Sequence, residues 1–127
     1  MIPDFYCRAR NGQFVLNGFE DTRSFIYVDD AIRATMLLAG DRGAQGEVVN
    51  VGGDSEIRIK DLGALMMEVA GLRGEIRLNP SPRGSVRRRV PNLDKLRRLI
   101  GRHPEISLRD GLRETARFYL HGAYKGL

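Results

Sequence analysis

The sequence contains a single cysteine, Cys7, and no long apolar run. One cysteine excludes an internal disulfide, which is typical of proteins from a reducing compartment. No apolar segment approaches the ~20 residues that a membrane-spanning helix needs. The first four residues also lack the basic and apolar regions of a signal peptide. We therefore expect a cytoplasmic protein that does not associate with a membrane.

The sequence also lacks a Tyr-x-x-x-Lys pair, in which a lysine four residues after a tyrosine helps to hold that tyrosine as an acid or base. The tyrosines are Tyr6, Tyr27, Tyr119 and Tyr124. The residues four positions after the first three are Arg10, Ala31 and Ala123. The two histidines, His103 and His121, are far apart and have no cysteine beside them, so no metal site is predicted.

One glycine-rich segment, 40–46, has the spacing GxxGxxG. In a dinucleotide site such a loop follows a strand and opens a helix, so that the helix amides face the phosphates. Here a predicted helix precedes the glycines and a predicted strand follows them. We therefore interpret the segment as a turn and expect this chain to bind no cofactor by itself.

What is present is enough for one ordinary domain, with 127 residues of which 42% are hydrophobic. The net charge of +5 is concentrated in the window 73–102, which contains ten basic and two acidic residues. The remainder contains 11 basic and 14 acidic residues, so the window carries +8 and the rest −3. Such a concentration fits a phosphate-bearing ligand, a nucleic acid or a solvated face.

Residue spacing predicts alternating helices and extended segments. The predicted helices are 2–9, 29–39, 62–70, 92–100 and one that starts after 107. The predicted extended segments are 13–16, 23–28, 47–51, 57–59 and 75–78, and 80–91 is predicted to be a loop. Asp29, Asn92 and Ser107 are the expected N-caps, the last with Asp110 in an approximate capping box. The pattern indicates a single α/β domain, 1–127.

Several motifs in order carry a family resemblance. Segment 22–38 reads TRSFIYVDDAIRATMLL, segment 48–53 reads VVNVGG, and the tail 93–112 has the spacing of D-x-S-K-x-R-x-L-L-G-W-x-P-x-x-x-L-x-x-G-L. The sequence is similar to the substrate-binding half of the NAD-dependent nucleotide-sugar epimerases and dehydratases, the extended short-chain dehydrogenase/reductase family. One departure is Arg102, where these enzymes usually carry an aromatic residue.

The resemblance implies an α/β fold equivalent to the C-terminal substrate-binding portion of these enzymes, without the main Rossmann domain. The parent enzymes oxidise a sugar carbon with tightly held NAD, rearrange or dehydrate the 4-keto sugar, and return the hydride. The portion equivalent to this chain binds the nucleotide diphosphate. We therefore expect a chain that binds a nucleotide-diphosphate sugar and is inactive alone, and the sequence leaves open whether it takes part in an enzyme.

The candidate substrate ligands begin with Arg23, because a guanidinium beside an aromatic strand can fork onto two phosphate oxygens. By itself, Arg23 could equally pair with Asp21 or Glu20. The family resemblance favours contact with the diphosphate. Asn50 of the VVNVGG segment is implied to lie near the nucleotide, although an asparagine that closes a turn explains the pattern as well.

The loop 80–89 supplies the other candidates. Its residues PRGSVRRR differ from the Arg-Pro-Gly-Asp-Val of many relatives and are closer to the Gly-Val-Arg-x-Arg of enzymes that resemble GDP-mannose 3,5-epimerase. This makes Arg87 the implied phosphate ligand and Arg89 its neighbour. Arg83 is a weaker candidate, and Arg88 is as well explained by a side chain that points to water.

Two other classes stay open. A nucleic-acid-binding protein would use the basic segment 83–98, but this segment has no interleaved aromatic residues to stack on bases. A non-catalytic interaction module would dock onto a separate Rossmann-type partner. We also expect a homo-oligomer, because the strand 48–51 and the apolar faces of the helices at Asp29 and Leu62 would lack their usual partner.

Overall fold

The computed structural model describes residues 1–101 and 104–122 and has a mixed α/β fold, as predicted. The helices are α1 Ile2–Ala9, α2 Val28–Gly40, α3 Ile59–Val69, α4 Asp94–Ile100 and α5 Leu108–Ala116, with a short 3-10 helix η1 Arg42–Ala44 and a π-helical turn η2 Arg117–His121. The strands are β1 Val15–Asn17, β2 Thr22–Ser24, β3 Glu56–Arg58, β4 Arg77–Asn79 and β5 Arg88–Arg89. All five predicted helices are confirmed, with ends that differ by a few residues.

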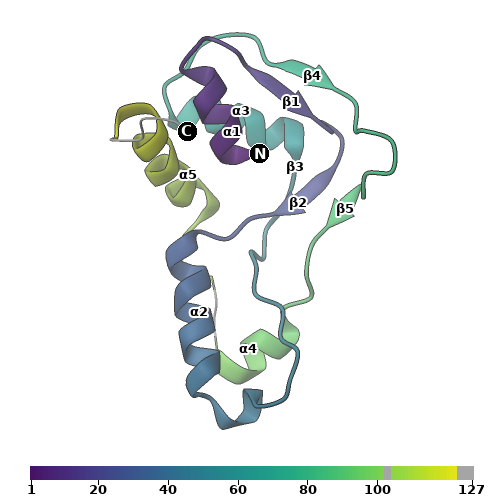
Figure 1. Cartoon of the computed structure of the whole chain (residues 1–127), viewed down its shortest axis with the longest axis vertical. Coiled ribbons are helices and arrows are strands. Elements are labelled where there is room, and N and C mark those ends of the chain that lie inside the picture. The colour runs from purple at the N-terminus through teal and green to yellow at the C-terminus, as the bar shows by residue number, and fades with distance from the viewer. Residues whose placement is uncertain (102–103, 123–127) are drawn as a thin grey trace.

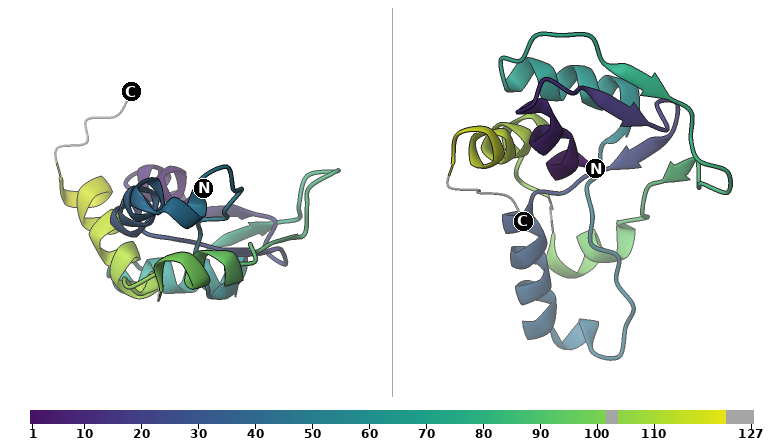
Figure 2. Two further views of the ribbon diagram at one scale, coloured as in Figure 1. Left: turned by 90° about the horizontal axis from the view of Figure 1, so that it is seen from below. Right: turned by 45° about the horizontal axis from the view of Figure 1, so that its top comes forward.

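The elements form two lobes along the long axis of the molecule (Figure 1). The upper lobe contains α1, α3, α5 and all the strands. The lower lobe contains α2, α4 and most of the chain that joins α2 to β3. Strands β1 and β4 pair in parallel, and a second sheet has the order β3-β2-β5. The loop between β4 and β5 projects from the body of the molecule (Figure 2).

The upper lobe holds the larger core, in which α1, β1, α3 and α5 meet. Phe5, Tyr6, Leu16, Leu62 and Met66 are its largest fully buried side chains. The hydroxyl of Tyr6 lies 3.5 Å from the carbonyl oxygens of Met66 and Leu112, and burial raises the pKa of Tyr6 to about 12. A tyrosine that is neutral and enclosed in this way ties three helices together.

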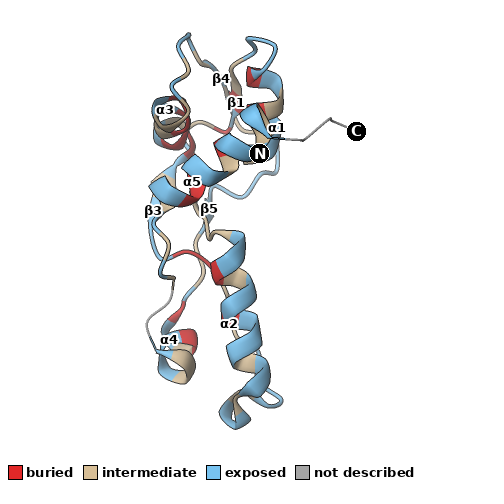
Figure 3. Ribbon diagram, turned by 90° about the vertical axis from the view of Figure 1, so that its left-hand side faces the viewer, coloured by how far each residue is buried: buried red, intermediate tan, exposed pale blue. Residues whose placement is uncertain are grey.

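The lower lobe has a much smaller core. Ala34 of α2 and the side chains of Leu93 and Leu96 are buried there, with Val49 and Val51 packed against them. Most of α2 is therefore exposed (Figure 3). Its apolar side chains Val28, Ile32, Met36 and Leu37 are each at least half exposed.

The predicted N-cap of the second helix is wrong. Helix α2 begins at Val28, with Tyr27 at the N-cap position, so Asp29 is an exposed residue of the first turn. Asp30 is instead the important acid, because it is 1% exposed and accepts hydrogen bonds from the backbone amides of Glu105 at 3.1 Å and Ile106 at 2.8 Å. It fixes the segment before α5 to the start of α2.

The predicted strand 47–51 is not a strand in the described structure. Its side chains alternate as a strand's would, since Val49 and Val51 pack inward while Val48 is 85% exposed. Among the described residues, however, the amides of 48–51 donate to no backbone carbonyl. The segment has the sequence pattern of a strand without a strand to pair with.

Gly53 ends this segment where it passes β2. A Cβ atom on Gly53 would lie 2.0 Å from the carbonyl oxygen of Phe25, so only glycine fits against that backbone. The second glycine of the VVNVGG motif is thus explained by the close packing of Gly53 against the backbone of Phe25.

Of the two cap predictions near the C-terminal end, that for Ser107 is confirmed and that for Asn92 is wrong. The side chain of Ser107 accepts from the amide of Asp110 and begins α5. Asn92 accepts from the amide of Asp94, although Leu93 holds the N-cap position of α4. Strand β5 lies within the predicted loop, which is a correction to that prediction.

Arg102, His103, Ala123 and Tyr124 lie outside the described residues. In the rest of the chain, no helix combines the length and apolar character needed to cross a membrane.

Candidate functional site

Arg23 lies on β2, the central strand of its sheet, and its side chain is 20% exposed. Its Nη1 donates to the carbonyl oxygens of Thr22 at 2.7 Å and Arg87 at 3.0 Å. Its Nη2 donates to the carbonyl oxygen of Val86 at 2.8 Å and to the carboxylate of Asp21 at 3.2 Å. The guanidinium therefore joins β2 to the end of the projecting loop.

Asp21 is the buried partner of this arginine, with only 5% of its surface exposed. Besides the ion pair with Arg23, its carboxylate accepts a hydrogen bond from the hydroxyl of Ser81 at 2.7 Å. Glu20, the other acid considered as a partner, pairs with Lys60 at 3.4 Å. Asp21 thus links the start of the loop to the arginine that binds the end of the loop.

The register of β2 and β5 brings two predicted site residues, Arg23 and Arg89, to one face. They pair in parallel register, and residues paired in this way share a face of the sheet. The amide of Thr22 donates to the carbonyl oxygen of Arg87, which lies in the bend just before β5 and outside the paired residues.

Arg88 takes the opposite side and has a specific partner. Its Nε and Nη2 donate to the carboxylate of Glu56 on β3 at 2.9 to 3.2 Å. Hydrogen bonds from Thr22 and then Arg88 hold the pKa of Glu56 below its ordinary value. The sequence left open whether Arg88 points to water; its side chain is 64% exposed and is held by this ion pair.

The remaining loop arginines have no such partner. Within the described residues, the side chains of Arg83, Arg87 and Arg89 make no hydrogen bond or ion pair. Arg83 lies at the tip of the loop, in a turn where the amide of Ser85 donates to the carbonyl oxygen of Pro82. Arg87 and Arg89 lie nearer to the sheet, so they are the loop cations best placed for a ligand held against it.

A cleft of about 310 Å³ opens beside Arg87. Its other lining residues are Phe19, Glu20, Asp21, Pro80 and Ser81. The cleft thus combines one arginine without a protein partner, a hydroxyl and two carboxylates that already have cationic partners. This mixture suits a ligand that has both an anionic group and hydroxyl groups.

Asn50 lies between Val49 and Val51, which pack in the core of the lower lobe, whereas Arg23 lies on β2 in the upper lobe. Its side-chain amide donates to the carbonyl oxygen of Asn92 at 3.2 Å, where α4 begins. Asn92 in turn lines a second cleft, of about 350 Å³, with Arg88 and Arg97. The described contacts of Asn50 are therefore those of a residue that fixes a turn.

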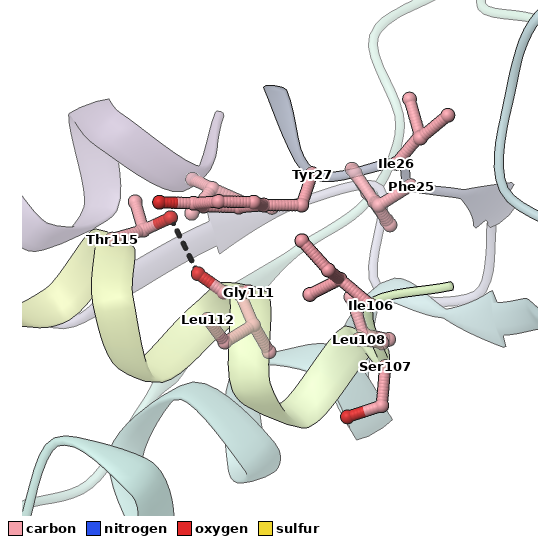
Figure 4. Close-up of a pocket in the computed structure, with 10 residues that line it drawn as sticks. Phe25, Ile26, Tyr27, Ile106, Ser107, Leu108, Gly111, Leu112 and Thr115 are labelled. Atoms are coloured by element: carbon pink, nitrogen blue, oxygen red, sulfur yellow. Dashed lines mark hydrogen bonds between the residues drawn. The ribbon is translucent and has the colours of Figure 1, made fainter. Parts of the chain in front are cut away.

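A third pocket, of about 50 Å³, lies under the ring of Tyr27 and against α5 (Figure 4). A Cβ on Gly111 would come within 3.1 Å of that ring, so the glycine permits the close approach. The lining consists mainly of apolar residues from 2, 25–27 and the start of α5, and contains no cation. This pocket does not suit a phosphate.

The glycine-rich segment 40–46 does not fit a dinucleotide. It begins at the last residue of helix α2 and contains the short η1, in which the amide of Gly43 donates to the side chain of Asp41. No strand precedes it and no long helix follows, so no row of free helix amides faces a phosphate. In the described residues, no three His, Cys, Asp or Glu side chains gather as a metal site requires.

Sequence reasoning named Asp21 as a possible partner of Arg23 but missed Ser81, which donates to Asp21. Asp21 and Ser81 are 60 residues apart, and no spacing rule connects them. The abundance of serine and proline in the loop predicted a turn and gave no sign of a hydrogen bond to a buried carboxylate.

Comparisons with known proteins agree with this architecture. Residues 1–52 match the family described as the NAD dependent epimerase/dehydratase family. GDP-L-fucose synthase 1 of Arabidopsis thaliana is 37% identical over 98 residues, which cover 77% of this chain and 30% of that protein. The dTDP-4-dehydro-6-deoxy-D-allose reductase of Streptomyces bikiniensis is 33% identical over 123 residues, which cover 95% of this chain and 37% of that protein.

A solved structure is similar over nearly the same length. The UDP-glucose 4-epimerase of Thermotoga maritima, in complex with UDP-glucose, superposes with a TM-score of 0.83 at 28% identity. The match covers 93% of this chain and 38% of that enzyme. The chain therefore spans between 30% and 38% of the length of these three proteins.

The fold and the matches define an α/β chain related to enzymes that act on nucleotide sugars. The resemblance found in the sequence is confirmed: residues 1–52 match the NAD dependent epimerase/dehydratase family, and over most of its length the chain is similar to a part of such enzymes.

Proposed function

We propose that the chain is the part of a nucleotide-sugar epimerase or dehydratase that binds the nucleotide diphosphate. Arg87 is the leading phosphate ligand, with Arg89 two residues further along the chain. The observation that carries the proposal is that the side chains of these two arginines make no hydrogen bond or ion pair in the described structure, whereas Arg88 between them is paired with Glu56. Two such cations near the cleft that Arg87 lines can hold two phosphate groups.

The relatives support the substrate class. They are a GDP-L-fucose synthase, a dTDP-sugar reductase and a UDP-glucose 4-epimerase, and the structure of the epimerase from Thermotoga maritima contains UDP-glucose. All three ligands share a nucleoside diphosphate and differ in the base and the sugar. We therefore propose the diphosphate as the group that this chain recognises. Arg83 at the loop tip and Asn50 at the turn before α4 would contact the outer parts of the ligand.

Nucleoside diphosphates are expected to bind weakly, and replacing Arg87 with alanine should raise Kd by about tenfold or more. This is the effect of losing a hydrogen bond to a charged group, about 1.5 to 3 kcal/mol. The matched control is Arg88→Ala, which removes a cation of the same type one residue away and should change Kd less than about threefold. Calorimetric titration with UDP and with GDP measures both.

Equal losses at Arg83, Arg87, Arg88 and Arg89 would contradict this site and indicate nonspecific charge. A nucleic-acid-binding protein would also respond in that way. It would in addition bind an oligonucleotide more tightly than UDP and lose that affinity steeply as the salt concentration rises.

The 127-residue chain by itself is expected to show no epimerase, dehydratase or decarboxylase turnover and to retain no NAD. The reason is that its tyrosines have no lysine four residues on and its glycine-rich segment does not fit a dinucleotide. Purified chain is incubated with NAD and a panel of nucleotide sugars, and 4-keto or epimerised products are sought. Turnover that disappears when a residue of this chain is changed would contradict the proposal.

We further propose that a Rossmann domain, in the same polypeptide or in a separate one, completes the lower lobe in the working protein, which acts in the cytoplasm. The surface for it consists of the exposed side chains Val28, Ile32 and Met36 of α2 together with segment 47–51. In the absence of that domain, a second copy of the chain covers this surface. We call this region the open face.

A further inference from the structure

Asp21 lies at the centre of the candidate site, where distant segments of the chain meet. It directly precedes β2, is 5% exposed and lines the cleft beside Arg87. Its backbone amide donates to the carbonyl oxygen of Gly18 at 2.9 Å. Its own carbonyl oxygen accepts from the amide of Ile59, the first residue of α3, at 2.9 Å. Both backbone polar groups of Asp21 are therefore fixed.

The turn before Asp21 is shaped around its carboxylate. Gly18 has a positive φ of 71°, and a Cβ atom there would lie 2.7 Å from Oδ2 of Asp21. A larger residue at Gly18 would therefore displace the carboxylate as well as strain the turn. A carboxylate enclosed in this way has to be satisfied where it lies, because an unpaired buried charge is costly.

Two side chains satisfy this carboxylate. Oδ1 of Asp21 accepts from the hydroxyl of Ser81, near the start of the projecting loop, at 2.7 Å. Oδ2 accepts from Nη2 of Arg23 on β2 at 3.2 Å. The guanidinium of Arg23 also donates to the carbonyl oxygens of Val86 and Arg87, at the end of the same loop. One carboxylate thus connects the central strand with both ends of the projecting loop.

These contacts hold the guanidinium of Arg23 in one orientation and leave one donor for a ligand. A guanidinium has five N–H donors in a fixed fork, of which four are on the two terminal nitrogens. The terminal nitrogens of Arg23 make four contacts within the protein, at 2.7 to 3.2 Å. Its Nε–H makes no hydrogen bond to the described residues, so it can donate to a phosphate oxygen while the fork stays in place.

We infer that Asp21 is the positioning residue of the diphosphate site: it orients Arg23 for contact with the ligand and holds the projecting loop so that Arg87 lies beside the cleft. This inference rests on the proposed function. As an anion, Asp21 itself is repelled by a diphosphate, and it favours binding only through the groups that it holds.

Asp21→Asn is expected to raise the Kd for UDP about tenfold, the effect of losing one hydrogen bond to a charged group. Asparagine keeps the shape of the side chain but has no charge and one acceptor oxygen in place of two. The matched control is Glu20→Gln, which removes the neighbouring acid of the same cleft, whose partner is Lys60 at 3.4 Å. This control should leave Kd unchanged or lower it, because it removes an anion near the diphosphate.

The opposite directions of the two effects separate positioning from charge. If Asp21 only added negative charge to the cleft, both substitutions would tighten UDP binding, and that result would overturn the inference. Asp30→Ala separates positioning from stability, because it removes another buried carboxylate, at the start of α2. This variant should lose stability and keep its Kd at a temperature where it is folded. An equal rise of Kd in both buried-acid variants would also overturn the inference.

A test without ligand measures how readily trypsin reaches the projecting loop. Release of Ser81 in Asp21→Asn should accelerate cleavage after Arg83 about tenfold relative to cleavage after Arg42, which lies on η1 in the other lobe. Glu20→Gln should leave both rates unchanged. Equal acceleration at both sites, or none after Arg83, would contradict the role of Asp21. A chain that binds no UDP would overturn the proposed function, and the ratio of cleavage rates would still decide whether Asp21 holds the loop.

Discussion

Replacing Asp30 with alanine is expected to lower the free energy of unfolding by about 3 kcal/mol. The carboxylate is 1% exposed and accepts from the amides of Glu105 and Ile106, so its removal leaves two amides without an acceptor. A hydrogen bond to a charged group contributes about 1.5 to 3 kcal/mol, and the two bonds share one oxygen. Urea denaturation of the variant and the original chain measures the difference.

Asp29→Ala is the matched control, because Asp29 is the adjacent acid on the same helix turn and is exposed. Its charge near the helix N-terminus contributes at most about 1 kcal/mol. Amide hydrogen exchange at Glu105 and Ile106 should accelerate in the Asp30 variant and stay the same in the Asp29 variant. Similar destabilisation by both substitutions would contradict the assigned role of Asp30.

This pair of acids also shows what sequence could predict. The sequence placed two acids at the start of a helix, and Asp29 was selected as the cap because its carboxylate could accept from the free amides of the first turn. The partners of Asp30 lie 75 and 76 residues further along the chain, so no local rule could identify them. Local patterns predicted the helix, and tertiary contacts decided which acid matters.

The helices were the most predictable part of the fold for the same reason. The apolar face of α3 and the Ser107 cap of α5 depend on residues within one or two turns of each other. Strand pairing depends on distant residues, so the short β5 among three arginines was missed. Segment 47–51 was predicted as a strand from its valines, but pairing requires a neighbour that the described structure does not provide.

The sequence offered candidate site residues but could not give their contacts. Arg23 and Arg89 were selected separately, and the β2–β5 register sets them on one face. The acceptors of Arg23 in the loop are backbone carbonyl oxygens, which every residue has, so sequence carries no signal for them. The ion pair of Arg88 with Glu56 could have been suspected only with the strand order in hand.

The isolated chain is expected to self-associate through the open face. Val28, Ile32 and Met36 are 56%, 57% and 70% exposed and lie one helical turn apart, which forms an apolar stripe on the outer side of α2. Segment 48–51 lies on the opposite side of α2, where Val49 and Val51 pack with Ala34, and its amides make no backbone hydrogen bond in the described structure, so they are available to another chain. Burial of such a stripe and pairing of such an edge both favour association.

Replacing Ile32 and Met36 together with glutamine should therefore raise the dissociation constant of the oligomer on the order of 10,000-fold, which corresponds to about 1.5 kcal/mol for each of two side chains on each of two copies. Full burial of one such side chain contributes about 1.5 to 3 kcal/mol, and in a symmetric dimer each change counts twice. Glutamine keeps the helix propensity and adds no charge, while the matched control, leucine at both positions, keeps the apolar surface. Light scattering across a dilution series measures all three proteins. A monomer at every concentration, or equal association of the glutamine and leucine variants, would show that the open face does not pair.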